Sequence, residues 1–268
     1  MVEPSFHRAD RLLTLDNIGV NYGERVILRD IRLQIDNLKR SDGKPQGQTV
    51  SLLGPSGIGK TQLFRCIAGL QQPSRGTVSL NNNGRPVMAG EVGVVSQHYP
   101  LFGHRSILGN MLLSTPDRKK AMAALERFGL ADKAHLYPTQ LSGGQRQRAA
   151  IAQQLLHGSQ FLLMDEPFSG LDILSKLSVC EAIADIVSSS EIATVIVITH
   201  DIETSVLIAD TLWVLGRERN TDNSPIAGAT IVKSFDLLER GLAYCNNASR
   251  LPAYHETVDE IIALFKHL

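Results

Sequence analysis

The chain has 268 residues, and its 27 Lys and Arg balance 27 Asp and Glu, so the formal net charge is zero. This length allows one large or two small domains with a sizeable core. The balanced charge does not favour nucleic acid or an anionic membrane surface as the main partner. No apolar run approaches the roughly 18 residues needed to span a bilayer, and residues 1–4 do not resemble a signal peptide. We therefore expect a soluble, cytosolic protein.

The first part of the chain predicts antiparallel strands followed by a loop. Residues 12–35 alternate apolar and polar positions on both sides of a turn at 21–24, a pattern typical of short antiparallel strands. Residues 36–48 are rich in Lys, Asp, Gly and Gln with hardly an apolar side chain. We expect them to form a solvated loop rather than a domain linker.

A glycine-rich segment follows the apolar run at 49–53 and precedes residues with helical spacing at 63–68. It matches the phosphate-loop pattern G-x-x-x-x-G-K-[ST], in which glycines let backbone N–H groups surround phosphate oxygens at a helix N-terminus. Lys60 can reach the β- and γ-phosphates, and the Thr61 hydroxyl can bind Mg²⁺. A purely structural glycine turn is the alternative, which the flanking strand and helix disfavour. The predicted triphosphate-binding residues are Gly54, Pro55, Ser56, Gly57, Ile58, Gly59, Lys60, Thr61 and Gln62.

The middle of the chain predicts two more strands and then helices. Strands are expected at 77–80 and at 92–96, the second ending at Gln97, and a helix is expected from Thr115-Pro116 to Gly129. A further helix opens at Ser142, where Gln145 three residues later completes a capping box.

The apolar runs at 161–164 and 194–198 lack alternation, as strands do that are buried on both faces of a parallel sheet. Between them a helical stripe predicts a core-facing helix. Late strands are expected at 211–215 and 229–235, and a short amphipathic helix at 256–268. The order implies an α/β core with an antiparallel edge and a helical insertion. The residues of the predicted core stripe are Ile173, Leu177, Cys180, Ala184 and Val187.

Three cysteines, Cys66, Cys180 and Cys245, are an odd number at unrelated spacings. Cys66 and Cys180 lie among apolar helical positions. We interpret both as small core residues of a protein from a reducing compartment.

Two carboxylates, Asp165 and Glu166, end the strand predicted at 161–164. The C-terminal ends of strands are where open α/β sheets bind ligands. Asp165 would hold Mg²⁺, directly or through water, and Glu166 would polarise an attacking water as a general base. The alternative is a solvated acidic turn.

The sequence Leu-Ser-Gly-Gly-Gln at 141–145 is a second helix N-terminus with exposed glycines, and so a second candidate anion site. A merely well-capped helix is an equally good interpretation of these residues alone. One chain with one nucleotide hardly needs two such sites, whereas two chains facing head to tail would use both.

Taken together, residues 12–213 resemble the ATP-binding-cassette (ABC) ATPase family. Residues 54–61 resemble its Walker A motif, 161–166 its Walker B motif with the catalytic glutamate, and 141–145 its signature motif. Other residues match the Q-loop (Gln97), the D-loop (169–172), the switch histidine (His200) and the aromatic that stacks on adenine (Tyr22). Taken singly, His200 could be a polar strand-end residue and Tyr22 a packing aromatic.

The resemblance implies a P-loop NTPase fold with a mostly parallel sheet, an antiparallel β edge subdomain and a helical signature subdomain. It implies a single domain over 1–268, with a core at about 12–215, a helical subdomain at about 98–157 and a C-terminal extension at 216–268. Residues after 215 are too few for the regulatory β-barrel of some sugar-import ATPases. One departure is Gln62, where the family commonly has a second hydroxyl residue.

The resemblance also implies an ATPase with ATP and Mg²⁺ as its ligands. Metal binding would fall to Thr61, Gln97 and Asp165, and catalysis to Glu166, His200, Lys60 and Gln97. The ATP bound by one subunit would contact the signature residues of a second subunit, most simply in a homodimer. The residues expected to make that contact are Ser142, Gly143, Gly144 and Gln145.

Further partners implied by the resemblance are integral-membrane permease subunits and an extracytoplasmic solute-binding protein, with no nucleic acid. The chain would lie on the inner face of the cell membrane. Residues 97–102 resemble small-solute import ATPases. The alternatives are an exporter or lipoprotein-release ATPase, a soluble ABC protein acting on ribosomes or DNA, and a nucleotide-gated module without turnover.

Overall fold

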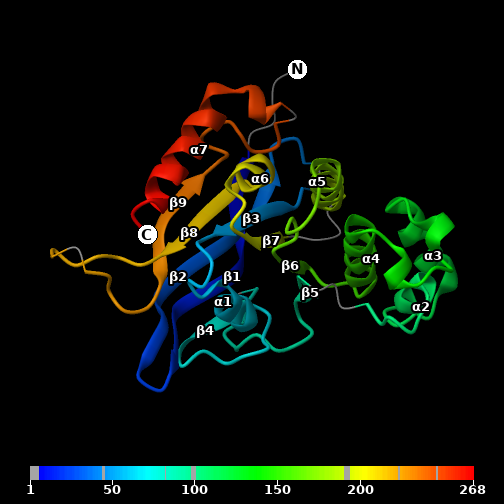
Figure 1. Ribbon diagram of the computed structural model, residues 1–268, viewed down its shortest axis with the longest axis horizontal. Helices are drawn as coiled ribbons and strands as arrows, with labels where there is room; N and C mark the ends of the chain where they lie inside the picture. Colours follow the sequence, from blue (N-terminus) through cyan, green and yellow to red (C-terminus); the bar gives the residue numbers. More distant parts are fainter. Residues whose placement is uncertain are drawn as a thin grey trace.

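A six-stranded sheet and a three-stranded sheet form the centre of the molecule (Figure 1). The computed structural model describes residues 6–43, 46–81, 83–97, 101–189, 194–222, 224–245 and 247–268. The strands are β1 (Phe6–Tyr22), β2 (Arg25–Arg40), β3 (Gln48–Leu53), β4 (Arg75–Leu80), β5 (Gly93–Val95), β6 (Phe161–Asp165), β7 (Thr194–Thr199), β8 (Thr211–Gly216) and β9 (Thr230–Asp236).

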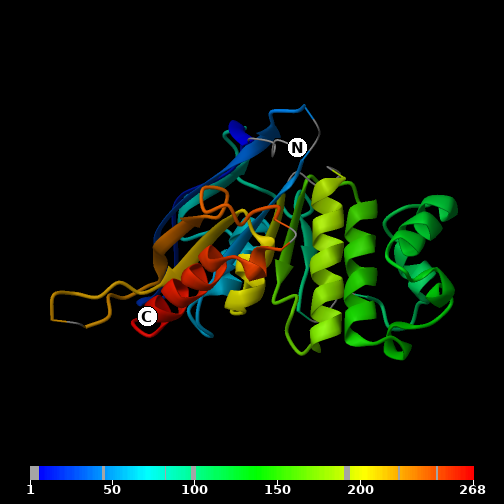
Figure 2. The same ribbon diagram turned by 90° about the horizontal axis from the view of Figure 1, so that it is seen from above.

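The helices cover the sheets and form a separate group beside them. They are α1 (Lys60–Ile67), α2 (Ile107–Met111), α3 (Arg118–Arg127), α4 (Gly143–Leu156), α5 (Ile173–Ser188), α6 (Ile202–Ile208) and α7 (Pro252–Phe265), with 3₁₀ turns at Ala131–Lys133, Pro138–Gln140 and Ala248–Arg250. Helices α2, α3 and α4 lie together at one end, and α4 and α5 run side by side (Figure 2). None of the described helices is long and apolar enough to cross a membrane.

The six-stranded sheet has the order β5-β6-β7-β3-β8-β9, and only the edge strand β9 is antiparallel to its neighbour. Every residue of β3 and β7 is buried, because both faces of these central strands are covered. This explains why the apolar runs in the sequence are continuous rather than alternating. The mostly parallel sheet, the antiparallel edge and the helical group confirm the predicted fold class.

The three-stranded sheet has the order β2-β1-β4 with antiparallel pairing. Its apolar face joins one core with α1 and with one face of the large sheet. Leu13 and Ile18 of β1, Leu63 and Ile67 of α1 and Ile198 of β7 belong to this core. Helix α1 therefore lies between the two sheets, and this packing fixes the direction of its N-terminus.

The loop predicted at 36–48 is wrong over its first residues. Strand β2 continues to Arg40, where it pairs with Phe6 at the start of β1. Ile35, directly before this segment, and Leu38, within it, are both buried. These two apolar positions were the available signal in the sequence. Residues 44–45 lie outside the described part of the chain.

The core stripe predicted on α5 is wrong at Ile173, Leu177 and Ala184, which are exposed, and confirmed at Val187, which is buried. Ile173 is 77% exposed and Leu177 is 46% exposed. The buried face instead contains Val179, Ile183 and Ile186, which lie one residue away in helical phase. The packing of α5 against α4 and β7 selects that face, and neighbouring apolar positions on both sides made the phase ambiguous in the sequence. Of the two cysteines expected in the core, Cys66 is buried and Cys180 only partly so.

Helix ends follow the sequence signals more closely. Ser142 caps α4 and forms the predicted capping box with Gln145. Helix α3 begins at Arg118 after an Asp117 cap, slightly later than expected, and Gly129 adopts a left-handed φ of 65° after its end, as predicted for a stop.

The C-terminal extension folds back onto the large sheet and α6. Helix α7 packs against α6, and the Tyr254 hydroxyl donates to the Glu203 carbonyl at 3.2 Å. The Tyr244 hydroxyl lies 3.0 Å from the Gly47 carbonyl and 3.2 Å from Asp210 Oδ2. The extension therefore closes over the end of the sheet at which β3 and β8 begin.

Candidate functional site

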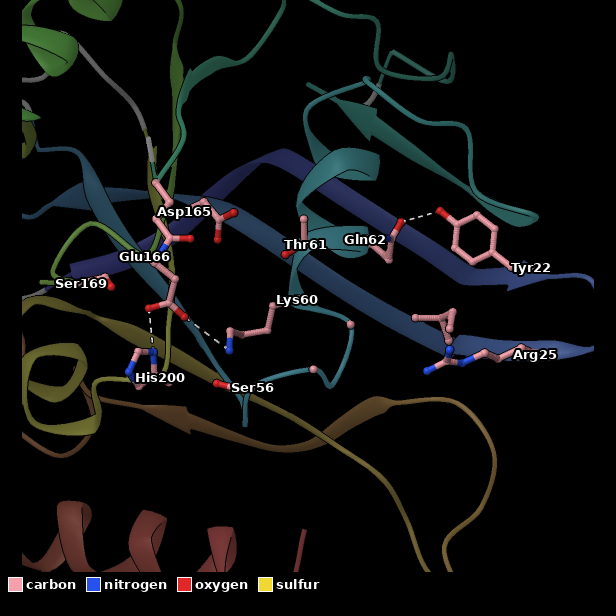
Figure 3. Close-up of a pocket in the computed structure, with 14 residues that line it drawn as sticks. Tyr22, Arg25, Ser56, Lys60, Thr61, Gln62, Asp165, Glu166, Ser169 and His200 are labelled. Atoms are coloured by element: carbon pink, nitrogen blue, oxygen red, sulfur yellow. Dashed lines mark hydrogen bonds and ion pairs between the residues drawn. The ribbon is translucent and has the colours of Figure 1, made fainter. Parts of the chain in front are cut away.

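A pocket of about 530 Å³ lies where the phosphate loop follows β3, beside the C-terminal ends of β6 and β7 (Figure 3). This is the edge at which open α/β sheets bind their ligands. Its side chains come from segments far apart in the sequence. The lining residues are Tyr22, Arg25, Ile27, Ser56, Gly57, Gly59, Lys60, Thr61, Gln62, Gln97, Asp165, Glu166, Ser169 and His200.

The phosphate loop depends on glycine at two positions. Gly57 and Gly59 have φ values of 77° and 117°, a region that side chains disfavour. A Cβ on Gly59 would also lie 2.9 Å from Leu28 Cδ2. The loop can thus pass closely over β2 and turn its N–H groups toward the pocket, as a phosphate cradle requires.

Lys60, the first residue of α1, reaches back across this loop. Its side chain is buried, and Nζ donates to the carbonyls of Gly54 at 2.8 Å and Pro55 at 3.2 Å. The same Nζ lies 3.4 Å from Glu166 Oε1. The Lys60 ammonium group therefore lies inside the pocket. Its hydrogen bonds to the two carbonyls can be replaced by hydrogen bonds to phosphate oxygens.

Glu166 lies at the centre of the contacts across the pocket. Its Oε2 accepts from the Thr199 hydroxyl at 3.0 Å and lies 2.8 Å from His200 Nδ1. The backbone of Glu166 is left-handed with φ 49°, and its N–H donates to the Ile198 carbonyl at 2.7 Å. A left-handed backbone at a residue other than glycine costs of order 1 kcal/mol. The contacts with Thr199, His200 and Ile198 keep Glu166 in this conformation.

Asp165 faces the same pocket from the last position of β6. Burial raises the pKa of Asp165, the neighbouring Glu166 charge raises it further, and Lys60 partly opposes both. A carboxylate in such surroundings gains from a nearby cation. Thr61 and Gln97 add a hydroxyl and an amide to the same lining. Hard oxygen ligands suit Mg²⁺, so the residues present fit that ion.

The opposite end of the pocket is formed by the turn between β1 and β2. Tyr22 is 53% exposed, and its hydroxyl donates to Gln62 Oε1 at 2.7 Å. Arg25 and Ile27 lie beside it. Sequence reasoning missed these two residues, although their position across the hairpin from Tyr22 was an available signal. It also missed Ser169 as a lining residue, although its segment had been matched to the D-loop.

Some predicted residues do not line the pocket. The carbonyls of Gly54 and Pro55, at the start of the loop, accept hydrogen bonds from Lys60 Nζ. Ile58 is buried in the core. The signature residues lie elsewhere in the chain, at the start of α4. The Ser142 N–H donates to Gln145 Oε1 at 2.9 Å, and the Gln145 N–H donates to Ser142 Oγ at 3.3 Å. Gly143 and Gly144 form the first turn of that helix.

Sequence comparison finds relatives of this chain among ATP-binding proteins of transport systems. A protein-family model described as ABC transporter matches residues 43–169. An aliphatic sulfonates import ATP-binding protein of Paracoccus denitrificans is 39% identical over 217 residues, covering 79% of this chain and 82% of the relative. A glutamine transport ATP-binding protein of Bacillus subtilis is 35% identical, covering 74% and 84%. The matched part of an aliphatic sulfonates import ATP-binding protein of Burkholderia thailandensis, 35% identical, spans 81% of this chain and 62% of that relative.

Solved structures share the fold. The cbiO1 protein of Clostridium perfringens, part of an ABC transporter complex, aligns with a TM-score of 0.70 and 24% identity over 86% of this chain and 90% of that one. MJ0796, an ATP-binding cassette solved as a dimer with ADP and phosphate, aligns with a TM-score of 0.65 and 24% identity over 84% of this chain and 99% of that one. Sequence and fold agree: the chain belongs to the ABC transporter family, among its ATP-binding proteins.

Proposed function

We propose that the chain is the Mg²⁺-dependent ATPase subunit of a membrane importer and that it acts as a head-to-tail pair. One observation carries the hydrolytic part of this proposal. Lys60, Glu166 and His200 come from three different segments and meet within hydrogen-bonding or ion-pair distance in one pocket. Apart from transfer of a phosphoryl group, little chemistry needs an ammonium group, a carboxylate and an imidazole at the mouth of a phosphate loop.

ATP binding would use both ends of the pocket. The Tyr22 ring would stack on the base, and the N–H groups of residues 56–61 would surround the phosphates. Lys60 Nζ would exchange the carbonyls of Gly54 and Pro55 for phosphate oxygens. When bound by Thr61, Gln97 and Asp165, Mg²⁺ would neutralise charge on the β- and γ-phosphates.

Hydrolysis would follow from the position of Glu166. Its carboxylate would accept a proton from a water molecule as that water oxygen bonds to the γ-phosphorus. The bond between the γ-phosphorus and the bridging oxygen breaks, and the electron pair leaves with ADP. The imidazole of His200 would contact the γ-phosphate, and this contact would be lost when the phosphate leaves.

Pairing with a second copy would complete the site. The first turn of α4 is capped by Ser142 and has no role in the pocket of its own chain, yet a helix N-terminus of this kind favours an anion. Ile173 and Leu174 are 77% and 78% exposed beside the segment that contains Ser169. An apolar surface next to the pocket suits burial against another subunit.

The names of the relatives support the import part of the proposal. Both the Paracoccus and the Bacillus proteins are named as ATP-binding proteins of uptake or transport systems. We infer that permease subunits and a solute-binding protein complete the complex, and that the chain lies at the cytoplasmic face of the membrane. The cargo would be a small solute chosen by those partners.

The test is the variant Glu166→Gln, which keeps the side-chain shape and removes the base. ATP hydrolysis by the chain assembled with its permease should fall at least about a hundredfold, the lower range for a general base. With saturating Mg²⁺-ATP, the variant should sediment as a stable pair, and the wild type should not. Lys60→Ala is the matched control, because it should abolish nucleotide binding and pairing together. Wild-type turnover by Glu166→Gln, or the absence of any pair, would contradict the proposal.

A further inference from the structure

The last residue of β7 lies against the proposed general base. Thr199 is completely buried, and its hydroxyl donates to Glu166 Oε2 at 3.0 Å. The preceding residue, Ile198, accepts the Glu166 N–H at 2.7 Å. The end of β7 therefore holds Glu166 twice, through its backbone and through its side chain.

The two oxygens of the Glu166 carboxylate have different surroundings. Oε2 is bound by Thr199 and His200, whereas Oε1 faces Lys60 at 3.4 Å across the pocket. The His200 side chain is 56% exposed, so its position is weakly fixed in the single chain. Among the described residues, Thr199 is the fully buried donor to this carboxylate.

A fixed carboxylate matters because a free one has many orientations. Fixing a glutamate side chain costs rotamer entropy, and a base must lie within hydrogen-bond reach of the proton that it accepts. The left-handed backbone of Glu166 places its side chain toward the pocket. It does not fix the rotation of the carboxylate plane, which the hydrogen bond from the Thr199 hydroxyl restricts.

We propose that Thr199 is a positioning residue for hydrolysis, whose hydroxyl binds Glu166 Oε2 so that Oε1 points at the attacking water. This inference rests on the proposed role of Glu166 as the base. Thr199 is not among the residues that line the pocket. It acts before the chemical step, because it reduces the number of orientations that the Glu166 carboxylate can adopt.

The experiment compares Thr199→Val, which has the same shape without the hydroxyl, with Thr199→Ser, which keeps the hydroxyl. For Thr199→Val, kcat should fall about tenfold, which corresponds to about 1.4 kcal/mol in the barrier, because the hydrogen bond that holds the charged base is lost. The Kd for Mg²⁺-ATP, measured by fluorescence titration, should stay within about twofold. Thr199→Ser should restore kcat to within about twofold of the wild type.

The Thr199 hydroxyl also accepts the Asp201 N–H at 3.2 Å, so a loss of α6 structure is a separate way in which the valine variant could fail. Circular dichroism and the Kd for Mg²⁺-ATP identify that case. Thr199→Cys, whose thiol is a weaker donor and still offers an acceptor to the Asp201 N–H, then supplies a second comparison, with kcat expected below that of Thr199→Ser. An unchanged kcat in a folded variant without the hydroxyl, or a low kcat for Thr199→Ser, overturns the inference.

A double variant separates this inference from the proposed function. In the Glu166→Gln background, loss of the Thr199 hydroxyl should lower single-turnover hydrolysis no further. A full tenfold additional loss there would show that Thr199 acts on something other than Glu166. If Glu166→Gln alone hydrolyses ATP like the wild type, the proposed function fails, whatever the Thr199 variants do.

Discussion

The aromatic ring of Tyr22 has half of its surface exposed at the end of β1, although large aromatic side chains usually bury more. Only its hydroxyl is fixed, by Gln62 and Gln71. The ring itself faces the pocket, so it can serve as a platform for a base.

We therefore expect Tyr22→Ala to weaken ATP binding about ten- to a hundredfold, because base–aromatic stacking contributes roughly 1–3 kcal/mol. Tyr22→Phe is the control: it keeps the ring and loses the hydrogen bond to Gln62, and should stay within about threefold of the wild type. Titration with a fluorescent ATP analogue measures both. Equal affinity for all three proteins would assign Tyr22 to packing.

Individual site residues differ in how far the sequence reveals them. Lys60 and Thr61 follow from a contiguous pattern whose chemistry depends on neighbours in the chain. Thr199 contacts Glu166 only because the large sheet places β7 beside β6. No local pattern contains that information, since it depends on strand order.

At the scale of elements, α4 combines a structural cap with a proposed contact to the nucleotide of a second chain. The Ser142 side chain accepts the Gln145 N–H, and replacement of such a cap by alanine costs about 1 kcal/mol. The two roles can be separated, because aspartate caps helices as well as serine does.

Ser142→Asp should therefore keep the thermal stability of the chain while it abolishes ATP-driven pairing and turnover. A carboxylate at this helix N-terminus is favourable in the single chain but would repel the triphosphate of the partner. Differential scanning calorimetry and ATPase assays measure the two effects, with Ser142→Ala as the variant that loses the cap. Normal turnover by a stable Ser142→Asp protein would exclude this contact.

Elements were predictable where one physical signal dominated. The buried strands β6 and β7 and the capping box of α4 match the sequence closely. The phase of α5 was not predictable, because apolar residues occur on two adjacent faces and tertiary packing chose between them. The extra length of β2 likewise depends on pairing with the distant start of β1.

At the scale of the whole molecule, Asp210 joins the large sheet to the C-terminal extension. Its Oδ2 accepts the Thr49 N–H at 2.7 Å and the Tyr244 hydroxyl at 3.2 Å. Complete burial raises the pKa of Asp210 from its ordinary 3.8 to about 7, although these two bonds, Thr211 and the Arg8 charge lower it in part. The folded chain therefore takes up a proton that the unfolded chain releases.

Stability should consequently fall as the pH rises through the interval between these two values. The contribution of Asp210 to the free energy of unfolding is fully present below about pH 4. It decreases by about 1.4 kcal/mol per pH unit as the pH rises toward 7. In urea unfolding between pH 5 and pH 8, Asp210→Asn should show a flatter dependence than the wild type. Tyr244→Phe, which keeps the carboxyl group, should retain the slope. Parallel curves for wild type and Asp210→Asn would contradict this role.

At Glu166 the requirements of stability and of ATP turnover differ, because the left-handed backbone disfavours glutamate and hydrolysis requires its carboxylate. Asparagine or glycine adopts such a φ more readily than glutamate does, so a chain selected for thermal robustness alone would drift toward those residues. Natural selection for ATP turnover would hold the acidic residue in place. Thermostabilised descendants of this protein would then be expected to gain their extra stability elsewhere and to leave this turn strained.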